Sequence, residues 1–230
     1  MNTDYIIVTL YLIPVFLISI SVHEFSHGYM SYKLGDPTAK NMGRLTLNPL
    51  KHIDWFGALT FILMRVGWAK PVPVNPIYYK NRKTGIILTS LAGALANITL
   101  ALLFAFPMAI TGASLGLKNS EMFVVGVSLF RGTDIQIILY NLFSLLFAVN
   151  IIIAVFNLLP VPPLDGSKIL SALLPSKYYY KIFRYEQYII LVFIAVIFIF
   201  PQVLHAIMSP FLWFFKFAIE CIVTGVLSIF

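Results

Sequence analysis

The stretch YIIVTLYLIPVFLISISVHEFSH (residues 5–27) joins a long apolar run to three ionisable side chains. The run is long enough to begin a membrane-spanning helix. His23, Glu24 and His27 continue that helix, and charges are costly where lipid surrounds them. Lys33, the first basic residue after them, lies ten residues beyond His23, which is roughly 15 Å along a helix. The cluster is therefore expected below the membrane surface, where ionisable groups indicate function.

The rest of the chain is equally apolar. Its 230 residues are 60% hydrophobic and 11% charged, about half the charge of a soluble domain. The expected fold is an all-α polytopic membrane protein of one domain, 1–230, with a core at about 5–175 and extra C-terminal helices at about 187–229. We expect about five transmembrane helices, near 5–32, 84–111, 135–159, 187–205 and 209–229. The N-terminus lacks a basic region of the kind found in signal peptides, so the first run is expected to be retained.

The net charge of +7 is unevenly distributed. Loop 33–83 carries nine Lys or Arg against two Asp, and loop 160–186 is also basic, whereas loop 112–134 is balanced. Basic loops on alternate sides fit the positive-inside rule, with the N-terminus outside and both basic loops in the cytoplasm. The basic charge thus has a topological explanation, and nucleic acid is not expected as a partner.

A shorter apolar stretch, WFGALTFILMRVGW (55–68), lies inside the first basic loop. It is too short to span a bilayer, and the prolines of AKPVPVNP after it favour extended chain. We therefore expect a re-entrant segment or β-hairpin near 55–76. Irregular backbone at membrane depth requires protein or a wet cavity beside it, so the segment indicates a cavity.

The HExxH pattern predicts a metal site. His23 and His27 lie four residues apart and share one helix face, and Glu24 lies beside it, where it could take a proton from water on the metal. Zn²⁺ suits nitrogen ligands and keeps a position open for water. A polar cluster between helices, without a metal, is the simpler alternative.

Two histidines leave the ligand set incomplete. His52 lies among loop signals and His205 near the outer end of its predicted span, so neither matches the depth and side of His23. Asp165 lies in NLLPVPPLDG (157–166), where prolines must end the third span on the expected cytoplasmic side. It could cap the helix that follows, but its position favours the third ligand role.

Several ordered motifs resemble the site-2 protease family of intramembrane zinc metalloproteases, in particular small bacterial and archaeal members without a PDZ domain. They are HEFSHGYMSYKLGDPTA, GRLTLNPLKHIDWFG, GWAKPVPVNP, LAGALAN and NLLPVPPLDG, and they cover about residues 20–170. The resemblance implies one zinc ion per chain, bound by His23, His27 and Asp165. It also implies that Glu24 is the general base.

Four further residues follow from the resemblance as oxyanion or substrate contacts. Asn157 would stabilise the oxyanion or hold substrate backbone, or could make a helix–helix hydrogen bond. Asn97, in a block where Ala94 stands in place of the family's proline, would contact substrate or pack between helices. Gly67 and Lys70 lie in the stretch that resembles the family's hairpin, which would pair with substrate as an added strand.

The expected function is hydrolysis of peptide bonds in or near transmembrane segments of partner membrane proteins. The expected location is a prokaryotic inner membrane, with the site toward the cytoplasm. Two alternative functions are a metal-ion transporter and a catalytically silent membrane adaptor. A transporter would spread polar residues through several spans, whereas here they cluster at one depth. An adaptor should lack Glu24 or a metal ligand, and all of them are present. GASLG (112–116) only half matches a serine protease motif, and Cys221 has no histidine near it in sequence.

Overall fold

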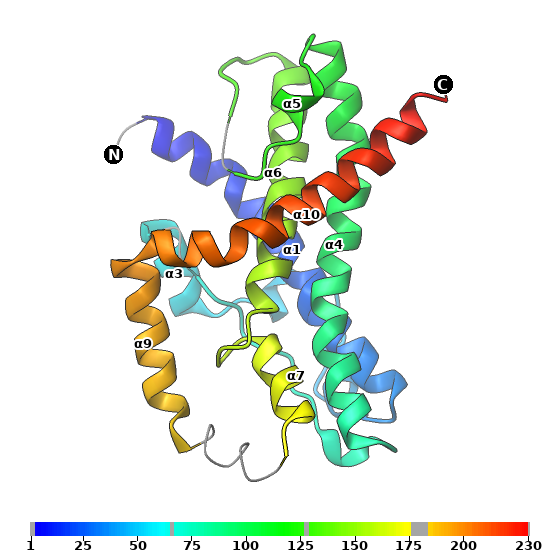
Figure 1. The fold of residues 1–230 in the computed structure, drawn as a ribbon, viewed down its shortest axis with the longest axis vertical. Helices are drawn as coiled ribbons and strands as arrows, with labels where there is room; N and C mark the ends of the chain where they lie inside the picture. Colours follow the sequence, from blue (N-terminus) through cyan, green and yellow to red (C-terminus); the bar gives the residue numbers. More distant parts are fainter. Residues whose placement is uncertain (1–2, 65–66, 127–128, 176–183, 230) are drawn as a thin grey trace.

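The computed structural model describes residues 3–64, 67–126, 129–175 and 184–229, and their regular structure is helical (Figure 1). Four of the described helices are long and apolar enough to cross a membrane: α1 (Thr3–Lys33), α4 (Arg82–Ser114), α6 (Ile135–Asn157) and α10 (Pro201–Leu227). The described part of the chain is thus all-helical with four candidate membrane spans, consistent with the multi-pass membrane protein that its composition predicts.

The long helices pack through small residues on α4. Ala101, Ala105 and Ala109 recur every four residues and are buried in one cluster with Phe147 and Ile151 of α6. Small side chains let two helix backbones approach closely, which is how helices associate in lipid. In Figure 1, α10 crosses this pair obliquely, while α1 lies behind it.

Short elements surround the end of the bundle where α1 finishes and α4 begins. They are α2 (Thr38–Asn41), η1 (Pro49–Lys51), η2 (Pro76–Tyr78) and α7 (Asp165–Leu173). On the other side lies α5 (Asn119–Met122). The short helix α3 (Trp55–Met64) lies instead beside the first half of α1, where the Tyr5 hydroxyl donates to the carbonyls of Ile62 and Leu63. Prolines at 160, 162 and 163 prevent α6 from continuing, and α7 then packs against the first half of α4 (Figure 1).

The predicted fifth span is not confirmed. Instead of a span at 187–205, α9 (Glu186–Ile199) has 14 residues, or about 21 Å, against a hydrocarbon core of about 30 Å. It ends because Phe200 precedes Pro201, and a residue before proline is disfavoured in helical conformation. The last span begins at Pro201 rather than near residue 209.

The predicted re-entrant segment or β-hairpin near 55–76 is not confirmed either. Residues 55–64 are helical, and the only pairing in the described part of the segment is an isolated bridge between Ile53 and Ala69. Pro71 and Pro73 lack N–H groups, so a regular ladder cannot continue through them. The remainder, 67–75, is extended chain beside the end of α1; residues 65–66 lie outside the described part.

Candidate metal centre

Two helices bring their polar stripes together. On α1, Ser19, His23, His27 and Ser31 recur every fourth residue and are buried. On α4, the facing stripe also has a four-residue period and consists of Thr89, Gly93 and Asn97. Residues four apart lie on one helix face, so the two stripes form one polar seam in an apolar bundle.

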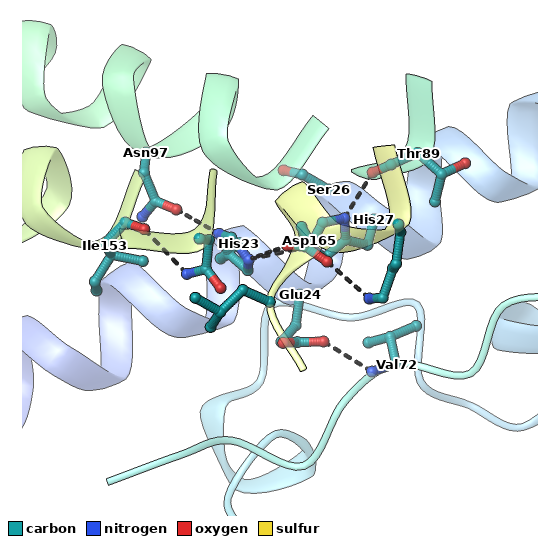
Figure 2. A network of polar contacts seen from close by, with 12 residues as sticks. His23, Glu24, Ser26, His27, Val72, Thr89, Asn97, Ile153 and Asp165 are labelled. Carbon is teal, nitrogen blue, oxygen red and sulfur yellow. Dashed lines mark hydrogen bonds and ion pairs between the residues drawn. The ribbon is translucent and has the colours of Figure 1, made fainter. Parts of the chain in front are cut away.

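Three ligand atoms converge at this seam (Figure 2). The Nε2 atoms of His23 and His27 are 3.0 Å apart. The Oδ2 atom of Asp165 lies 3.2 Å from Nε2 of His23 and 2.9 Å from Nε2 of His27. We call these three atoms the donor triangle. All three side chains are buried, and the structure thus brings together the three residues that the sequence predicts as ligands.

The outer ring nitrogens fix which imidazole atoms face the triangle. Nδ1 of His27 lies 2.6 Å from the carbonyl oxygen of Thr89, which can only accept, so His27 donates from Nδ1. Nδ1 of His23 lies 2.6 Å from Oδ1 of Asn97. The orientation of Asn97 follows from its neighbour Asn150, because the Leu146 carbonyl requires the Nδ2 group of Asn150.

The amide of Asn150 therefore presents Oδ1 to Nδ2 of Asn97, 2.6 Å away, and Nδ2 of Asn97 also donates to the Ser19 carbonyl. Oδ1 of Asn97 is left to accept from His23. In neutral imidazoles, both Nε2 atoms then carry lone pairs that point into the donor triangle. This is the arrangement that partner groups impose on histidines that bind metals.

The donor triangle fits a divalent cation. Two lone pairs and a carboxylate oxygen at contact distance repel one another unless a proton or a cation lies between them. Tetrahedral zinc at about 2.0–2.1 Å from its ligands would place them about 3.3 Å apart, close to the observed 2.9–3.2 Å. A single cation satisfies all three atoms.

Gly93 makes room for the two imidazoles. A Cβ atom at this position would lie 2.6 Å from Cε1 of His23 and 2.6 Å from Nε2 of His27. Real Cβ atoms do not approach other heavy atoms so closely, and only glycine fits here without a shift.

Asp165 is the first residue of α7, whose N-cap position is Leu164. Its Oδ2 faces the two imidazoles. Its Oδ1 accepts from Nζ of Lys168 at 2.7 Å. A lysine ammonium at this distance favours the ionised form of the carboxylate.

Glu24 lies beside the triangle but is not part of it. Its Oε2 accepts from the backbone N–H of Val72 at 2.8 Å (Figure 2). The extended segment thus touches the residue that the sequence predicts as the general base.

A pocket of about 310 Å³ opens onto the triangle and Glu24. Its walls come from the extended segment (Pro71, Val72, Val74), from α4 and from α7. Asn157 lines it too, and its Nδ2 donates to the Ile153 carbonyl one turn back.

Three residues expected to contact substrate lie elsewhere. Asn97 is fully buried behind His23 rather than in the pocket wall, so the structure supports a role as a histidine partner. Gly67 packs against the backbone of Gly57, and Lys70 is exposed, with its backbone bound to His52 and Arg44. Neither Gly67 nor Lys70 lines the pocket.

The two rejected histidines also lie away from the centre. His52 is buried with its Nε2 against the Thr46 carbonyl, and His205 is exposed on α10. Sequence reasoning missed Thr89, Gly93 and Asn150. The four-residue period from Thr89 to Asn97 was the available signal for the first two, whereas Asn150 has no such signal.

Comparison with known proteins agrees with this geometry. Residues 11–200 match Peptidase family M50. "Putative zinc metalloprotease YwhC" of Bacillus subtilis (strain 168) is 37% identical over 191 residues, which cover 83% of this chain and 81% of the relative. "Putative zinc metalloprotease Rip2" of Mycolicibacterium smegmatis (strain ATCC 700084 / mc(2)155) is 27% identical over 221 residues, covering 94% and 76%. No solved structure matches the chain significantly.

Proposed function

The chain belongs to peptidase family M50 and is a zinc metalloprotease, and we propose that it cleaves partner membrane proteins within or near their transmembrane segments. The observation that supports the proposal is the position of the donor triangle on a membrane-length helix. Two of its atoms come from α1, which is long and apolar enough to cross a membrane. We infer that a peptide bond reaches Glu24 from the membrane or its edge.

In the proposed centre, His23, His27 and Asp165 hold the zinc ion. Zinc, when bound, would act as a Lewis acid, lowering the pKa of water and polarising a carbonyl group. Lys168 and the partners of the imidazoles keep the three ligands ionised or correctly oriented.

Glu24 is the proposed general base. Its carboxylate takes a proton from the water molecule that attacks the scissile carbonyl, and then gives that proton to the leaving amine. The Val72 N–H holds Oε2 in place, which leaves Oε1 for proton transfer. The reaction consumes one water and breaks one C–N bond.

Substrate would be held as extended chain, because a helix hides its peptide bonds from attack. The extended segment that includes Val72 and Val74 lines the pocket and is the proposed partner for substrate backbone. Asn157 is the proposed oxyanion contact. One of its two amide hydrogens is engaged by the Ile153 carbonyl, which leaves the other to donate.

The proposed topology has the N-terminus outside and the pocket toward the cytoplasm of a prokaryotic cell, since the basic loops surround the pocket. Residues 1–230 would form one domain. The helix α3 supports a segment that dips into the membrane, because Trp55, Phe56 and Leu63 are strongly exposed and suit an interface with lipid.

Reconstitution tests the proposal. The purified protein and a single-span membrane protein from the same cell are placed in liposomes, and the cleavage position is mapped by mass spectrometry. We expect cleavage inside or beside the transmembrane segment, with Asp165→Ala as the inactive control. Cleavage confined to a soluble region, or equal cleavage by Asp165→Ala, would overturn the proposal.

A further inference from the structure

A second buried carboxylate, Asp36, lies just beyond the end of α1 and outside the donor triangle. It is fully buried and accepts four hydrogen bonds. Oδ1 accepts from the backbone and side chain of Thr38, and Oδ2 accepts from Oγ of Ser31 and from the backbone N–H of Asn75, both at 2.7 Å. A carboxylate that fills all its acceptor sites is rigidly placed.

From Asp36 a chain of hydroxyl groups runs back toward the donor triangle. Oγ of Ser31 lies 2.7 Å from the hydroxyl of Tyr79, which lies 3.1 Å from Oγ1 of Thr89. The Thr89 carbonyl in turn accepts from Nδ1 of His27 at 2.6 Å. Since Ser31 and His27 are one turn apart on α1, these contacts close a circuit between α1 and α4.

The direction of the hydroxyl bonds follows from the charge at one end. An ionised carboxylate only accepts, so Ser31 donates to Asp36. Ser31 then accepts from Tyr79, and Tyr79 accepts from Thr89. Each bond polarises the next, so a chain anchored by a charge is stronger than its separate parts.

We propose that Asp36 is a positioning residue for the metal centre, acting on His27 through Ser31, Tyr79 and Thr89. The same carboxylate also accepts from the backbone N–H of Asn75, which belongs to the extended segment. Asp36 therefore helps to position both His27 and the pocket wall that this segment forms. The inference rests on the proposed function, because it assigns His27 to zinc. Of the residues in this hydrogen-bonded chain, His27 alone contributes an atom to the donor triangle.

Ser31→Ala is the cleanest test, because Ser31 is fully buried and does not line the pocket. Ser21→Ala is the matched control: Ser21 lies on the same helix, is buried, and among the described residues its hydroxyl bonds only to the Leu17 carbonyl at 2.6 Å. Zinc affinity of the metal-depleted protein is measured by competition with a chelator. We expect Ser31→Ala to bind zinc about fivefold more weakly, and Ser21→Ala to match the native chain.

Cleavage kinetics and a double variant separate positioning from general destabilisation. Ser31→Ala should lower kcat about fivefold and leave KM within about twofold. Adding Tyr79→Phe to Ser31→Ala should cause no further loss of zinc affinity, because both interrupt one chain. Additive losses, or equal zinc affinity in Ser31→Ala and Ser21→Ala, would overturn the inference.

The zinc measurement also separates this inference from the proposed function. If the native protein binds zinc but cleaves no membrane substrate, the proposed function fails while the zinc comparison still decides the role of Asp36. If Ser31→Ala does not fold, Tyr79→Phe carries the measurement, since its ring stays against Gly85. Tyr140→Phe, which alters a buried tyrosine against Met122, is then the control, and equal zinc affinity in the two overturns the inference.

Discussion

Replacing Gly93 by alanine should weaken zinc binding at the metal centre while leaving the helix intact. The added Cβ would lie 2.6–2.7 Å from atoms of both imidazoles, whereas ordinary contacts begin at 3.4 Å. One or both rings must therefore move by about 0.8 Å. A misplacement of about 1 Å at a reacting centre costs about 10²-fold in rate, so we expect zinc affinity and kcat/KM to fall by about that factor.

The effect of Gly93→Ala on the stability of the helix has the opposite sign. Alanine is about 0.5–1 kcal/mol more favourable than glycine inside a helix, so Gly93→Ala need not lower the content of folded protein. Gly225→Ala in α10 is the matched control, because a Cβ there meets nothing within 4 Å. The assay is zinc per chain after dialysis, together with cleavage. A Gly93→Ala protein that retains stoichiometric zinc and native activity would refute the assignment of the two imidazoles.

Three further outcomes follow. Asn97→Ala should weaken zinc binding about 10–100-fold, because it removes the acceptor that orients His23; unchanged affinity in chelator titrations would contradict this. Removing zinc should lower the melting temperature, and adding zinc should restore it; saturation to about 1,000 times Kd is worth about 4 kcal/mol, and equal melting of both forms would contradict it. Burial raises the pKa of Asp36, but hydrogen bonds from Thr38, Asn75 and Ser31 lower it overall. The stability that Asp36 contributes should therefore be complete above about pH 4 and be lost as the pH falls further; acid melting that is identical in Asp36→Asn would contradict this.

Much of the arrangement of the metal centre can be predicted from the sequence alone. The HExxH period places His23 and His27 on one face, and the prolines before Asp165 end a helix where a third ligand is needed. Both are local rules, which is why they succeed. The partner of His23 depends on the packing of α1 against α4 and α6, and no spacing within one helix predicts it.

The two expectations that the structure does not confirm, the fifth span and the hairpin, share one origin. The span at 187–205 is predicted from the apolar composition of that stretch. This criterion does not take into account Pro201, which divides the stretch into α9 and the start of α10. The hairpin expectation took extended chain to imply pairing, although Pro71 and Pro73 remove the donors that a ladder needs. In each case a backbone constraint at proline overrides the average character of the segment.

Zinc content and proteolysis, measured together on Glu24→Gln, test the central claim most directly. The substitution keeps the shape of the side chain and an oxygen that can accept from Val72, while it removes the group that takes the proton. Zinc should remain near one per chain, and cleavage of a membrane substrate should disappear. Cleavage that persists in Glu24→Gln, with zinc bound, would contradict the account.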